Sequence, residues 1–280
     1  MLANTKDVLK QAQNQKYAVA AFNVYNLETV QVAIQMAEKE EQPVIIALGE
    51  RYFPTVDVEG FSAMVQGIAA KTSVPVCLHL DHAYEKASII RAIRSGFTSV
   101  MYDGSKYELE KNIHYTKEVV DIAHMAGVSV EAEIGSLARG AFSDEEEGNG
   151  TLTDPKLAKQ FVAETNVDFL AAAIGTVHGM YQGEPNINLA LLEEIRNEVD
   201  VPLVLHGGSG TPDDIIRNSI KSGICKININ TEVSMAAVSY LHNYFQENKT
   251  THLSTVMANT QEAIEPVITK FIRLFANKQN

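Results

Sequence analysis

The sequence predicts one (β/α)8 barrel, the TIM-barrel fold, with an extra C-terminal helix, and three observations support this. Its 280 residues are a typical length for a single barrel. Short apolar runs alternate along the chain with stretches of helical period. These runs are continuous, as in strands covered on both faces, which favours a parallel sheet. An open doubly wound sheet is the alternative, but no glycine-rich dinucleotide motif follows the first run.

Eight strands are predicted in chain order: VAAFNV (19–24), PVIIAL (43–48), VPVCLHL (74–80), SVMYDG (99–104), VSVEAEIG (128–135), FLAAAIG (169–175), VPLVLHGG (201–208) and KININT (226–231). The stretches between them, such as LETVQVAIQMAEKEE, have helical period. The connection over residues 138–154 is long, polar and glycine-bearing, so we expect a mobile active-site loop. Residues 254–277 are helical in period and extend beyond the eighth unit. We expect this extension to cover the barrel or to pair with another subunit.

Composition excludes several classes of protein. The net charge is −12 and the pI is about 5.1, with no basic cluster to neutralise nucleic-acid phosphates. No apolar run reaches the roughly 18 residues of a membrane helix, and the start lacks the apolar core of a secretory signal. We therefore expect a cytoplasmic protein with no membrane or nucleic-acid partner. Cys77 and Cys225 lie within apolar runs, which predicts buried free thiols.

Polar side chains gather where the predicted strands end, and in such barrels this rim carries the chemistry. The residues expected there are Asn23, Asp81, His82, Asp103, Glu133, His178, His206, Asn228 and Asn230. Three imidazoles with an open fourth position make a catalytic zinc site, so His82, His178 and His206 predict one bound zinc ion. The other five histidines lie within strands or on helices and receive no role.

Asp81 and His82 are adjacent, and adjacent side chains of a strand point to opposite faces. Both can face one mouth only if the strand ends there, so we expect it to end there, with Asp81 as the acid–base partner of the metal site. Capping of the next helix is the alternative. Asp103 and Glu133 have two interpretations: they orient a ligating histidine, or they hold a second divalent or monovalent cation.

Two loops are predicted to bind phosphate. The sequence HGGSG follows the seventh strand, and residues 228–231 follow the eighth. Loops after strands 7 and 8 are the usual phosphate site of these barrels, where glycine lets backbone amides approach the anion. Local amides of this kind are needed here, because the negative overall charge works against an anionic substrate.

The sequence resembles the class II, metal-dependent ketose-bisphosphate aldolases. The matching segments are AFNV (21–24), HLDH (79–82), MYDGS (101–105), EAEIG (131–135), AIGTVHGMY (173–181), LVLHGGSG (203–210) and KININTE (226–232). The resemblance implies reversible aldol cleavage of a ketose phosphate to dihydroxyacetone phosphate and an aldehyde, in a homodimer or homotetramer.

The resemblance also implies roles for individual residues. It places zinc on His82, His178 and His206, makes Asp81 the proton donor, and puts Asp103 and Glu133 at the positions of a second metal. It assigns the dihydroxyacetone-phosphate site and the pocket lining to Gly179, Gly207, Gly208, Ser209, Asn228, Ile229, Asn230, Thr231 and Asn23, with Asn230 also counted as catalytic. In the family, a loop glutamate exchanges a proton on dihydroxyacetone phosphate. Of the acids in 143–147, Glu145 is our candidate.

Two departures from the family fall on the aldehyde half of the substrate. Gly49 stands where the family often has Ser or Thr, and VMANTQEAIEP lacks the arginine that helps the fructose enzymes hold a second phosphate. Arg51 is predicted to bind substrate, either in place of that arginine or against an acidic or polyhydroxy aldehyde. Tagatose- and fructose-1,6-bisphosphate are therefore the expected substrates, with a ketose 1-phosphate as the alternative.

Three other functions compete with this one. A Schiff-base aldolase needs a lysine at the mouth, whereas Lys226 is expected at the far end of the eighth strand. A metal-dependent isomerase or hydrolase of sugar phosphates would use the same histidines. A non-catalytic sugar-phosphate sensor would keep HGGSG, but it would not need Asp81.

Overall fold

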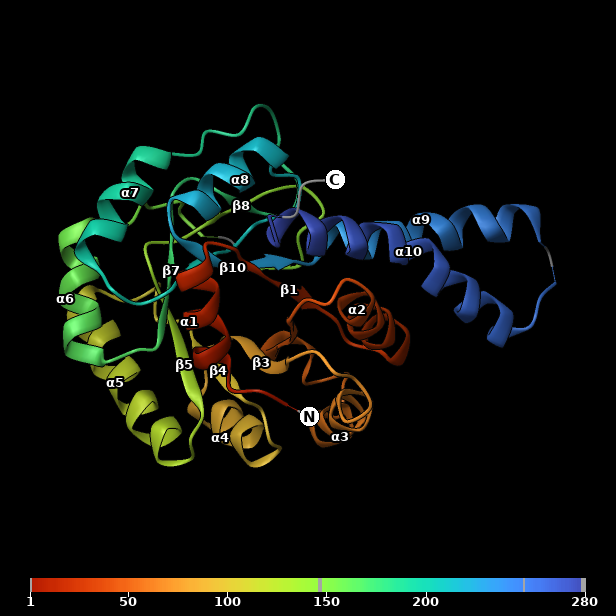
Figure 1. The fold of residues 1–280 in the computed structure, drawn as a ribbon, viewed down its shortest axis with the longest axis horizontal. Coiled ribbons are helices and arrows are strands. Elements are labelled where there is room, and N and C mark those ends of the chain that lie inside the picture. Colours follow the sequence, from red (N-terminus) through yellow and green to blue (C-terminus); the bar gives the residue numbers. More distant parts are fainter. Residues whose placement is uncertain (1, 146–147, 249, 278–280) are drawn as a thin grey trace.

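The computed structural model, which describes residues 2–145, 148–248 and 250–277, confirms the barrel (Figure 1). Eight parallel strands close in the order β1-β10-β9-β7-β5-β4-β3-β2, which rules out the open sheet. Their bounds are β1 (Val19–Asn23), β2 (Val44–Gly49), β3 (Val76–Ala83), β4 (Ser99–Tyr102), β5 (Ser129–Ile134), β7 (Phe169–Ala172), β9 (Leu203–Leu205) and β10 (Ile224–Ile229). Every residue in these eight strands is buried, as their continuous apolar runs predicted.

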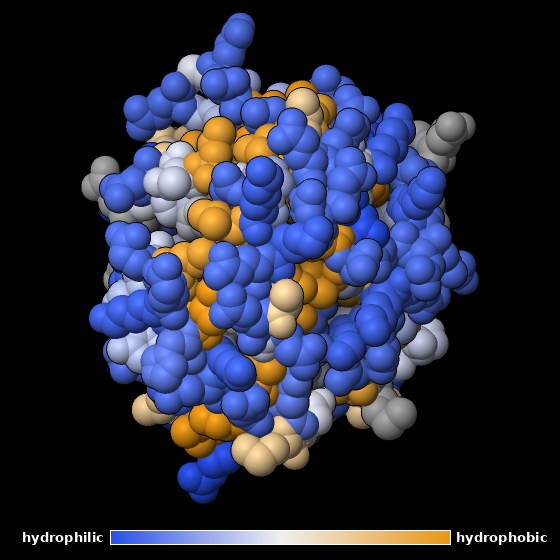
Figure 2. Space-filling model, turned by 90° about the vertical axis from the view of Figure 1, so that its left-hand side faces the viewer, coloured by the Kyte–Doolittle hydropathy of each residue, from blue (hydrophilic) through white to orange (hydrophobic). Residues whose placement is uncertain are grey.

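Helices surround the strands, and their sequences fix where they begin. The outer helices are α2 (Leu27–Lys39), α3 (Val58–Ala69), α4 (Lys86–Arg94), α5 (Leu109–Met125), α6 (Pro155–Thr165), α7 (Leu189–Glu198) and α8 (Asp213–Lys221). Asn26, Asp57, Asp154 and Asn188 cap four of them by accepting hydrogen bonds from first-turn amides. Figure 2 shows the left-hand side of Figure 1, where hydrophilic side chains dominate and hydrophobic ones lie in strips between them.

Helix α1 (Thr5–Gln15) closes the bottom of the barrel. Its buried Val8, Leu9 and Ala12 join an apolar cluster formed by inward-facing residues of several strands. Cys77 and Cys225 belong to this cluster as buried free thiols, as predicted. The lower barrel is therefore largely apolar, apart from hydroxyl groups such as that of Thr5, which donates to Ser99 Oγ at 2.7 Å.

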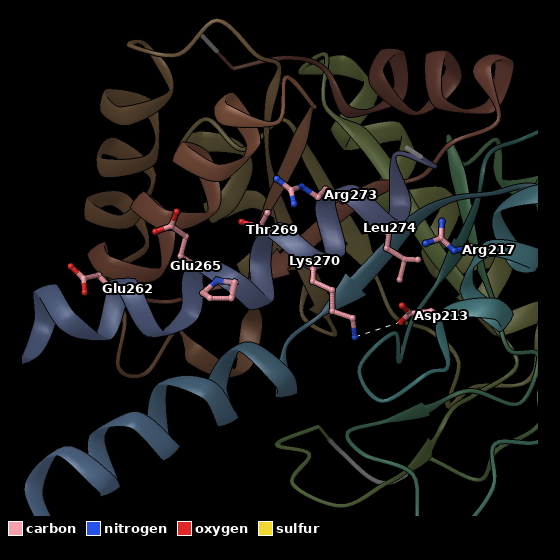
Figure 3. A pocket seen from close by; sticks show the side chains of 9 residues that line it. Asp213, Arg217, Glu262, Glu265, Thr269, Lys270, Arg273 and Leu274 are labelled. Atoms are coloured by element: carbon pink, nitrogen blue, oxygen red, sulfur yellow. Dashed lines mark ion pairs between the residues drawn. The ribbon is translucent and has the colours of Figure 1, made fainter. Parts of the chain in front are cut away.

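The chain ends in two long helices, α9 (Thr231–Glu247) and α10 (Leu253–Phe275). Helix α10 packs against α2, α8 and β1, so it fills the eighth helix position of the barrel. An ion pair of 3.5 Å between Lys270 Nζ and Asp213 Oδ1 joins it to α8 across a charged surface groove (Figure 3). The predicted C-terminal helix thus covers the barrel, and the additional helix is α9, which projects outward with the start of α10 (Figure 1).

Two further short strands bring distant loops together. Strand β6 (Ala138–Arg139) lies in the predicted active-site loop and pairs in parallel with β8 (Val177–His178). An isolated antiparallel bridge joins Ala141 to Met180 just beyond them. The loop after β5 therefore lies directly beside the segment that carries His178. Within the described residues, no helix has the length and apolar character to cross a membrane.

The position of α10 predicts its share of stability. Phe271 is 1% exposed in the main core, whereas Phe245 on α9 is 54% exposed. We expect Phe271→Ala to lower the free energy of unfolding by about 3–5 kcal/mol, because it leaves a cavity under α10. Phe245→Ala, the matched control, should change it by less than about 0.5 kcal/mol. Urea unfolding followed by circular dichroism measures both, and equal effects would contradict the packing described.

Candidate metal centre and active site

Three histidine side chains from different parts of the barrel meet at its mouth. His82 Nε2 and His206 Nδ1 are 3.0 Å apart, and the His178 ring lies 5.0 Å from the His82 ring between centroids. One nitrogen from each of the three histidines lies within 4.8 Å of the others. The predicted triad is therefore assembled in a geometry that can hold one ion.

Carboxylates fix the far side of two of these rings. Asp103 Oδ2 lies 2.9 Å from His82 Nδ1, and Glu131 Oε1 lies 2.7 Å from His206 Nε2. Each carboxylate can accept an N–H from its imidazole, which leaves the facing nitrogens, His82 Nε2 and His206 Nδ1, as the pair that a metal would bind. His178 Nε2 is buried and has no hydrogen-bond partner among the residues that the structure describes. A bound cation would satisfy all three nitrogens, so the site fits a metal.

The electrostatics of the triad favour a cation. Burial works to lower the pKa of His82, but Asp81 and other carboxylates outweigh it and raise that pKa to about 10. Burial, together with His82, holds the pKa of His178 well below its ordinary value. Burial likewise lowers the pKa of His206. The neighbouring carboxylates thus favour positive charge at the triad. His178 and His206 are neutral, which is the form of histidine that binds metal.

Strand β3 does not end at Asp81, contrary to the prediction. It continues to Ala83, with a register shift against β4 between Leu80 and Ala83. His82 has a φ of 40°, in the left-handed region that non-glycine residues rarely adopt. This break turns His82 to the same side as Asp81, which an unbroken strand would forbid. Backbone strain of this kind costs about 1–3 kcal/mol and is typical of functional sites.

Asp81 is fixed by two asparagines. Asn23 Nδ2 donates to Oδ2 at 2.7 Å, and Asn228 Nδ2 donates to Oδ1 at 3.1 Å. Burial raises the pKa of Asp81, but His82, His206 and Lys226 outweigh it and hold this pKa well below its ordinary value. Asp81 is therefore an oriented, ionised carboxylate beside the metal ligands, and it can accept a proton.

A buried ion pair behind the triad was missed by the sequence analysis. Lys226 Nζ donates to Glu131 Oε2 at 2.8 Å, and neither side chain is exposed. Lys226 is the third residue of β10 and points into the barrel, not to its far end. His79, which was given no role, lies between the acids, with Nε2 3.4 Å from Glu131 Oε2 and 3.8 Å from Asp81 Oδ1. The two-residue spacing of Glu131 and Glu133, and of Lys226 and Asn228, was the available signal, because alternate residues share a face.

Asp103 and Glu133 have different surroundings. Asp103 pairs with His82 and also accepts hydrogen bonds from Ser105. Glu133 is buried, and its Oε2 has no hydrogen-bond partner within the described part of the chain. Burial, and then Asp103, raises the pKa of Glu133 well above its ordinary value. His82, Asp103 and Glu133 together offer three ligand atoms within 4.8 Å of one another. The geometry is therefore compatible with both interpretations, in which the two acids orient His82 or bind a second cation.

The two predicted phosphate loops lie side by side. The amide of Gly208 donates to the Asn228 carbonyl at 3.1 Å, and Gly207 has a φ of 71°. A Cβ on Gly207 would lie 2.2 Å from the Val177 carbonyl oxygen, so only glycine fits there. Helix α9 begins at Thr231, and its N-cap residue Asn230 makes no side-chain capping hydrogen bond within the described residues, whereas the Glu232 amide donates to Ser209 Oγ of the other loop at 3.4 Å. The first-turn amides of α9 make the adjoining loop a candidate anion site.

The described part of the predicted active-site loop folds over the mouth. Glu145 contributes a ligand atom within 4.8 Å of those of Asp81 and His82, and it forms an ion pair with Arg51. Burial raises the pKa of Glu145, against the effects of His82 and Arg51. Glu146 and Glu147, the other glutamates considered, lie outside the described residues.

One cavity unites most of the predicted residues. It is lined by Asn23, Asp81, Ser143, Asp144, Glu145, His178, Gly179, His206, Gly207, Gly208, Ser209, Asn228, Asn230 and Thr231. His82, Asp103 and Glu133 line a second cavity, which shares Glu145 and His178 with the first, and Ile229 is buried in the core. Arg51 stands behind the loop acids and does not line this cavity.

The class of protein follows from this arrangement. Metal-dependent barrel enzymes hold their ion on histidines at the strand ends and leave a position open for substrate. The family model described as fructose-bisphosphate aldolase class-II matches residues 3–280. The chain belongs to this family, which makes it an aldolase that cleaves a carbon–carbon bond with the help of a metal. The resemblance seen in the seven segments is confirmed, and it displaces the three competing functions.

Solved structures agree with this assignment. The YdjI aldolase from Escherichia coli K12 is 38% identical, with a TM-score of 0.88 over 98% of this chain and 97% of that one. A protein from Coccidioides immitis assigned as a fructose-1,6-biphosphate aldolase is 29% identical, with a TM-score of 0.88 over 97% and 96% of the two chains. The fructose-bisphosphate aldolase from Campylobacter jejuni, at 20% identity and a TM-score of 0.80 over 98% and 94%, has the same fold.

The buried pair behind His206 predicts a change in metal affinity. We expect Glu131→Gln to weaken zinc binding about 10- to 100-fold, because a carboxylate that accepts the far N–H of a ligand makes the imidazole a better donor. The substitution also leaves Lys226 without its counter-charge, which lowers stability. The double variant Glu131→Gln/Lys226→Met should recover stability but not affinity.

Competition with a chromophoric chelator measures the zinc affinity of these variants. Glu198→Gln is the control, since Glu198 pairs with Lys159 on the surface at 2.8 Å. Unchanged affinity in Glu131→Gln would show that Glu131 serves folding alone.

Proposed function

We propose that this aldolase uses one zinc ion to cleave a ketose phosphate reversibly into dihydroxyacetone phosphate and an aldehyde. Tagatose- or fructose-1,6-bisphosphate is the expected substrate, and a ketose 1-phosphate without the second phosphate is the alternative. One observation carries the proposal: His178, His206, Asp81 and the two anion-binding loops line a single cavity, and His82 completes the three-histidine centre beside it, with Nε2 3.0 Å from His206 Nδ1. The fructose-1,6-biphosphate assignment of the Coccidioides immitis relative supports the substrate class.

His82, His178 and His206 would hold the ion. Its binding would displace the proton from His82, and three neutral rings would then leave the full charge of the ion available. A bound zinc ion supplies a Lewis acid that stabilises the negative charge developing beside the ketone during cleavage. Asp81 takes the proton from the hydroxyl group of the breaking carbon, and it returns this proton in condensation. Asn23 and Asn228 keep the carboxylate pointed at that hydroxyl group.

The phosphate of the dihydroxyacetone half is assigned to the loop residues Gly179, Gly207, Gly208 and Ser209 and to the start of α9. Its ketone end then lies toward the histidines, because the cavity joins these two regions. Asn230 borders the same space, with its Nδ2 3.1 Å from Asp144 Oδ1. Glu145 stands opposite Asp81 and is proposed to exchange the proton on dihydroxyacetone phosphate.

Several finer points stay predictions. They are a second divalent or monovalent cation at Asp103 and Glu133, a homodimer or homotetramer, and a cytoplasmic location. Direct contact of Arg51 with the aldehyde half is the alternative to the role argued for Arg51 below. The aldehyde half lies toward Gly49 and Arg51, where the chain departs from its family. Losing a charge-assisted phosphate contact costs about 1.5–3 kcal/mol, or roughly 10-fold or more in affinity.

Removal of the metal should abolish cleavage and leave the barrel folded. The core is apolar and closed without the triad, so the ion is not needed for the fold. Activity and far-ultraviolet circular dichroism are measured before and after chelation, and then after addition of zinc. Full activity in metal-free protein would refute the mechanism.

Glu145→Gln should slow proton exchange on dihydroxyacetone phosphate by about 100-fold or more, because the general base is lost. Loss of tritium or deuterium from labelled dihydroxyacetone phosphate measures this step without an aldehyde present. Glu198→Gln is the control, because Glu198 lies in a surface ion pair with Lys159. An unchanged rate in Glu145→Gln would remove the role from Glu145.

The substrate assignment is tested by cleavage of a panel of ketose bisphosphates and matching ketose 1-phosphates, with released dihydroxyacetone phosphate as readout. We expect cleavage of the panel with catalytic efficiency highest for tagatose- or fructose-1,6-bisphosphate. A preference for the ketose 1-phosphates would select the alternative. Failure to release dihydroxyacetone phosphate from every member would contradict the proposed function.

A further inference from the structure

Arg51 belongs to the short helix η1 (Glu50–Tyr52), which follows β2 directly. Its side chain folds back over the end of that strand. A Cβ built on Gly49 would lie 3.1 Å from Arg51 Nε and 3.2 Å from an outer guanidinium nitrogen. Any side chain at position 49 would therefore displace the Arg51 guanidinium group by a few tenths of an ångström or more. Gly49 and Arg51 are therefore one feature, because the glycine leaves the space that the guanidinium group occupies.

The guanidinium group of Arg51 contacts the active-site loop and not the cavity. One terminal nitrogen forms an ion pair with Glu145, and the other lies 3.4 Å from Asp144 Oδ1. The Tyr52 hydroxyl group donates to Asp144 Oδ2, and Asn230 Nδ2 donates to Asp144 Oδ1 at 3.1 Å. Two carboxylates therefore meet a single guanidinium group, whose charge is already neutralised. A substrate anion would have to displace one of them.

The same loop is fastened from its other side. The Gly140 amide donates to the His178 carbonyl at 2.7 Å, and Ala141 exchanges two backbone hydrogen bonds with Met180 at 2.7 and 2.8 Å. Gly179 permits this approach, since a Cβ there would lie 2.4 Å from the Ala141 carbonyl oxygen. Backbone pairing thus fixes residues 140–141 beside His178. The acids at 144 and 145 lie beyond this pairing and depend on side-chain contacts.

We propose that Arg51 is a positioning residue, which holds Asp144 and Glu145 over the metal ligands, and that Gly49 provides the space for it. Its charge fixes the loop acids, and it does not bind the second phosphate of the substrate. The catalytic part of this inference rests on the proposed function of Glu145, whereas the structural part does not. Misplacing a catalytic group by about 1 Å can cost roughly 100-fold in rate.

Four variants of the zinc-loaded protein test the proposal: Arg51→Met, Arg51→Lys, Gly49→Ser and the control Arg91→Met. Arg91 forms an equally forked pair with Glu59 on the outer helices, at 2.6 and 2.9 Å. Amide hydrogen exchange of a peptide spanning residues 140–145 reports the loop directly. Values of kcat and KM are measured on a bisphosphate and on the matching 1-phosphate, together with proton exchange on dihydroxyacetone phosphate.

In Arg51→Met we expect amide exchange in 140–145 to rise about 10-fold or more and kcat to fall by the same factor on both substrates. KM should change little. Arg51→Lys should retain part of the effect, because lysine reaches one carboxylate and cannot fork to two. Gly49→Ser should shift both readouts in the same direction, and Arg91→Met should leave both unchanged.

Unchanged amide exchange in Arg51→Met, with KM raised for the bisphosphate alone, would overturn the proposal and make Arg51 a phosphate ligand. Faster amide exchange with unchanged kcat would overturn its catalytic part. If the native protein cleaves no ketose phosphate, the proposed function fails instead, and amide exchange still decides whether Arg51 holds the loop.

Discussion

The site depends on one break in one strand. Strand β3 supplies both Asp81 and His82, and only the left-handed backbone at His82, with its register shift against β4, lets adjacent side chains face the same mouth. The strain is offset because neighbouring elements fix both residues, through Asp103 on His82 and through Asn23 and Asn228 on Asp81. An acid–base group thereby lies beside a metal ligand at a distance set by the backbone.

Charge is arranged in layers around this break. The triad faces inward, Asp103 and Glu131 accept the far N–H groups, and Lys226 neutralises Glu131 from below. A buried charge is tolerated only when it is paired and hydrogen-bonded, so these layers allow ionised groups in a closed barrel. Although the chain carries a net charge of −12, the site has one region suited to a cation, at the histidines, and another suited to an anion, at the two loops.

Much of this was predictable from the sequence, for physical reasons that also explain the misses. Continuous apolar runs identified all eight strands, and strand ends identified the triad, because parallel strands gather their carboxyl ends. The run containing Asp81 could not reveal a strand that continues past a break, since backbone strain leaves no mark on composition. Lys226 and His79 were missed because they are polar residues within apolar runs. Their side chains point into the interior of the barrel, and only the closed fold shows which residues meet there. The pairing of Arg51 with Glu145 joins positions far apart in the chain, and no local pattern records such a contact.

The strand break at His82 turns the side chains of His82 and Asp81 toward the same ion, and of these two only His82 is expected to bind it. X-ray diffraction from zinc-loaded crystals, recorded at the zinc absorption edge, locates the ion directly. The account predicts one strong anomalous peak about 2.1 Å from a nitrogen of each of His82, His178 and His206, with Asp81 outside bonding distance. A peak bonded to Asp81, or a main peak on Asp103 and Glu133 away from His178 and His206, would contradict it.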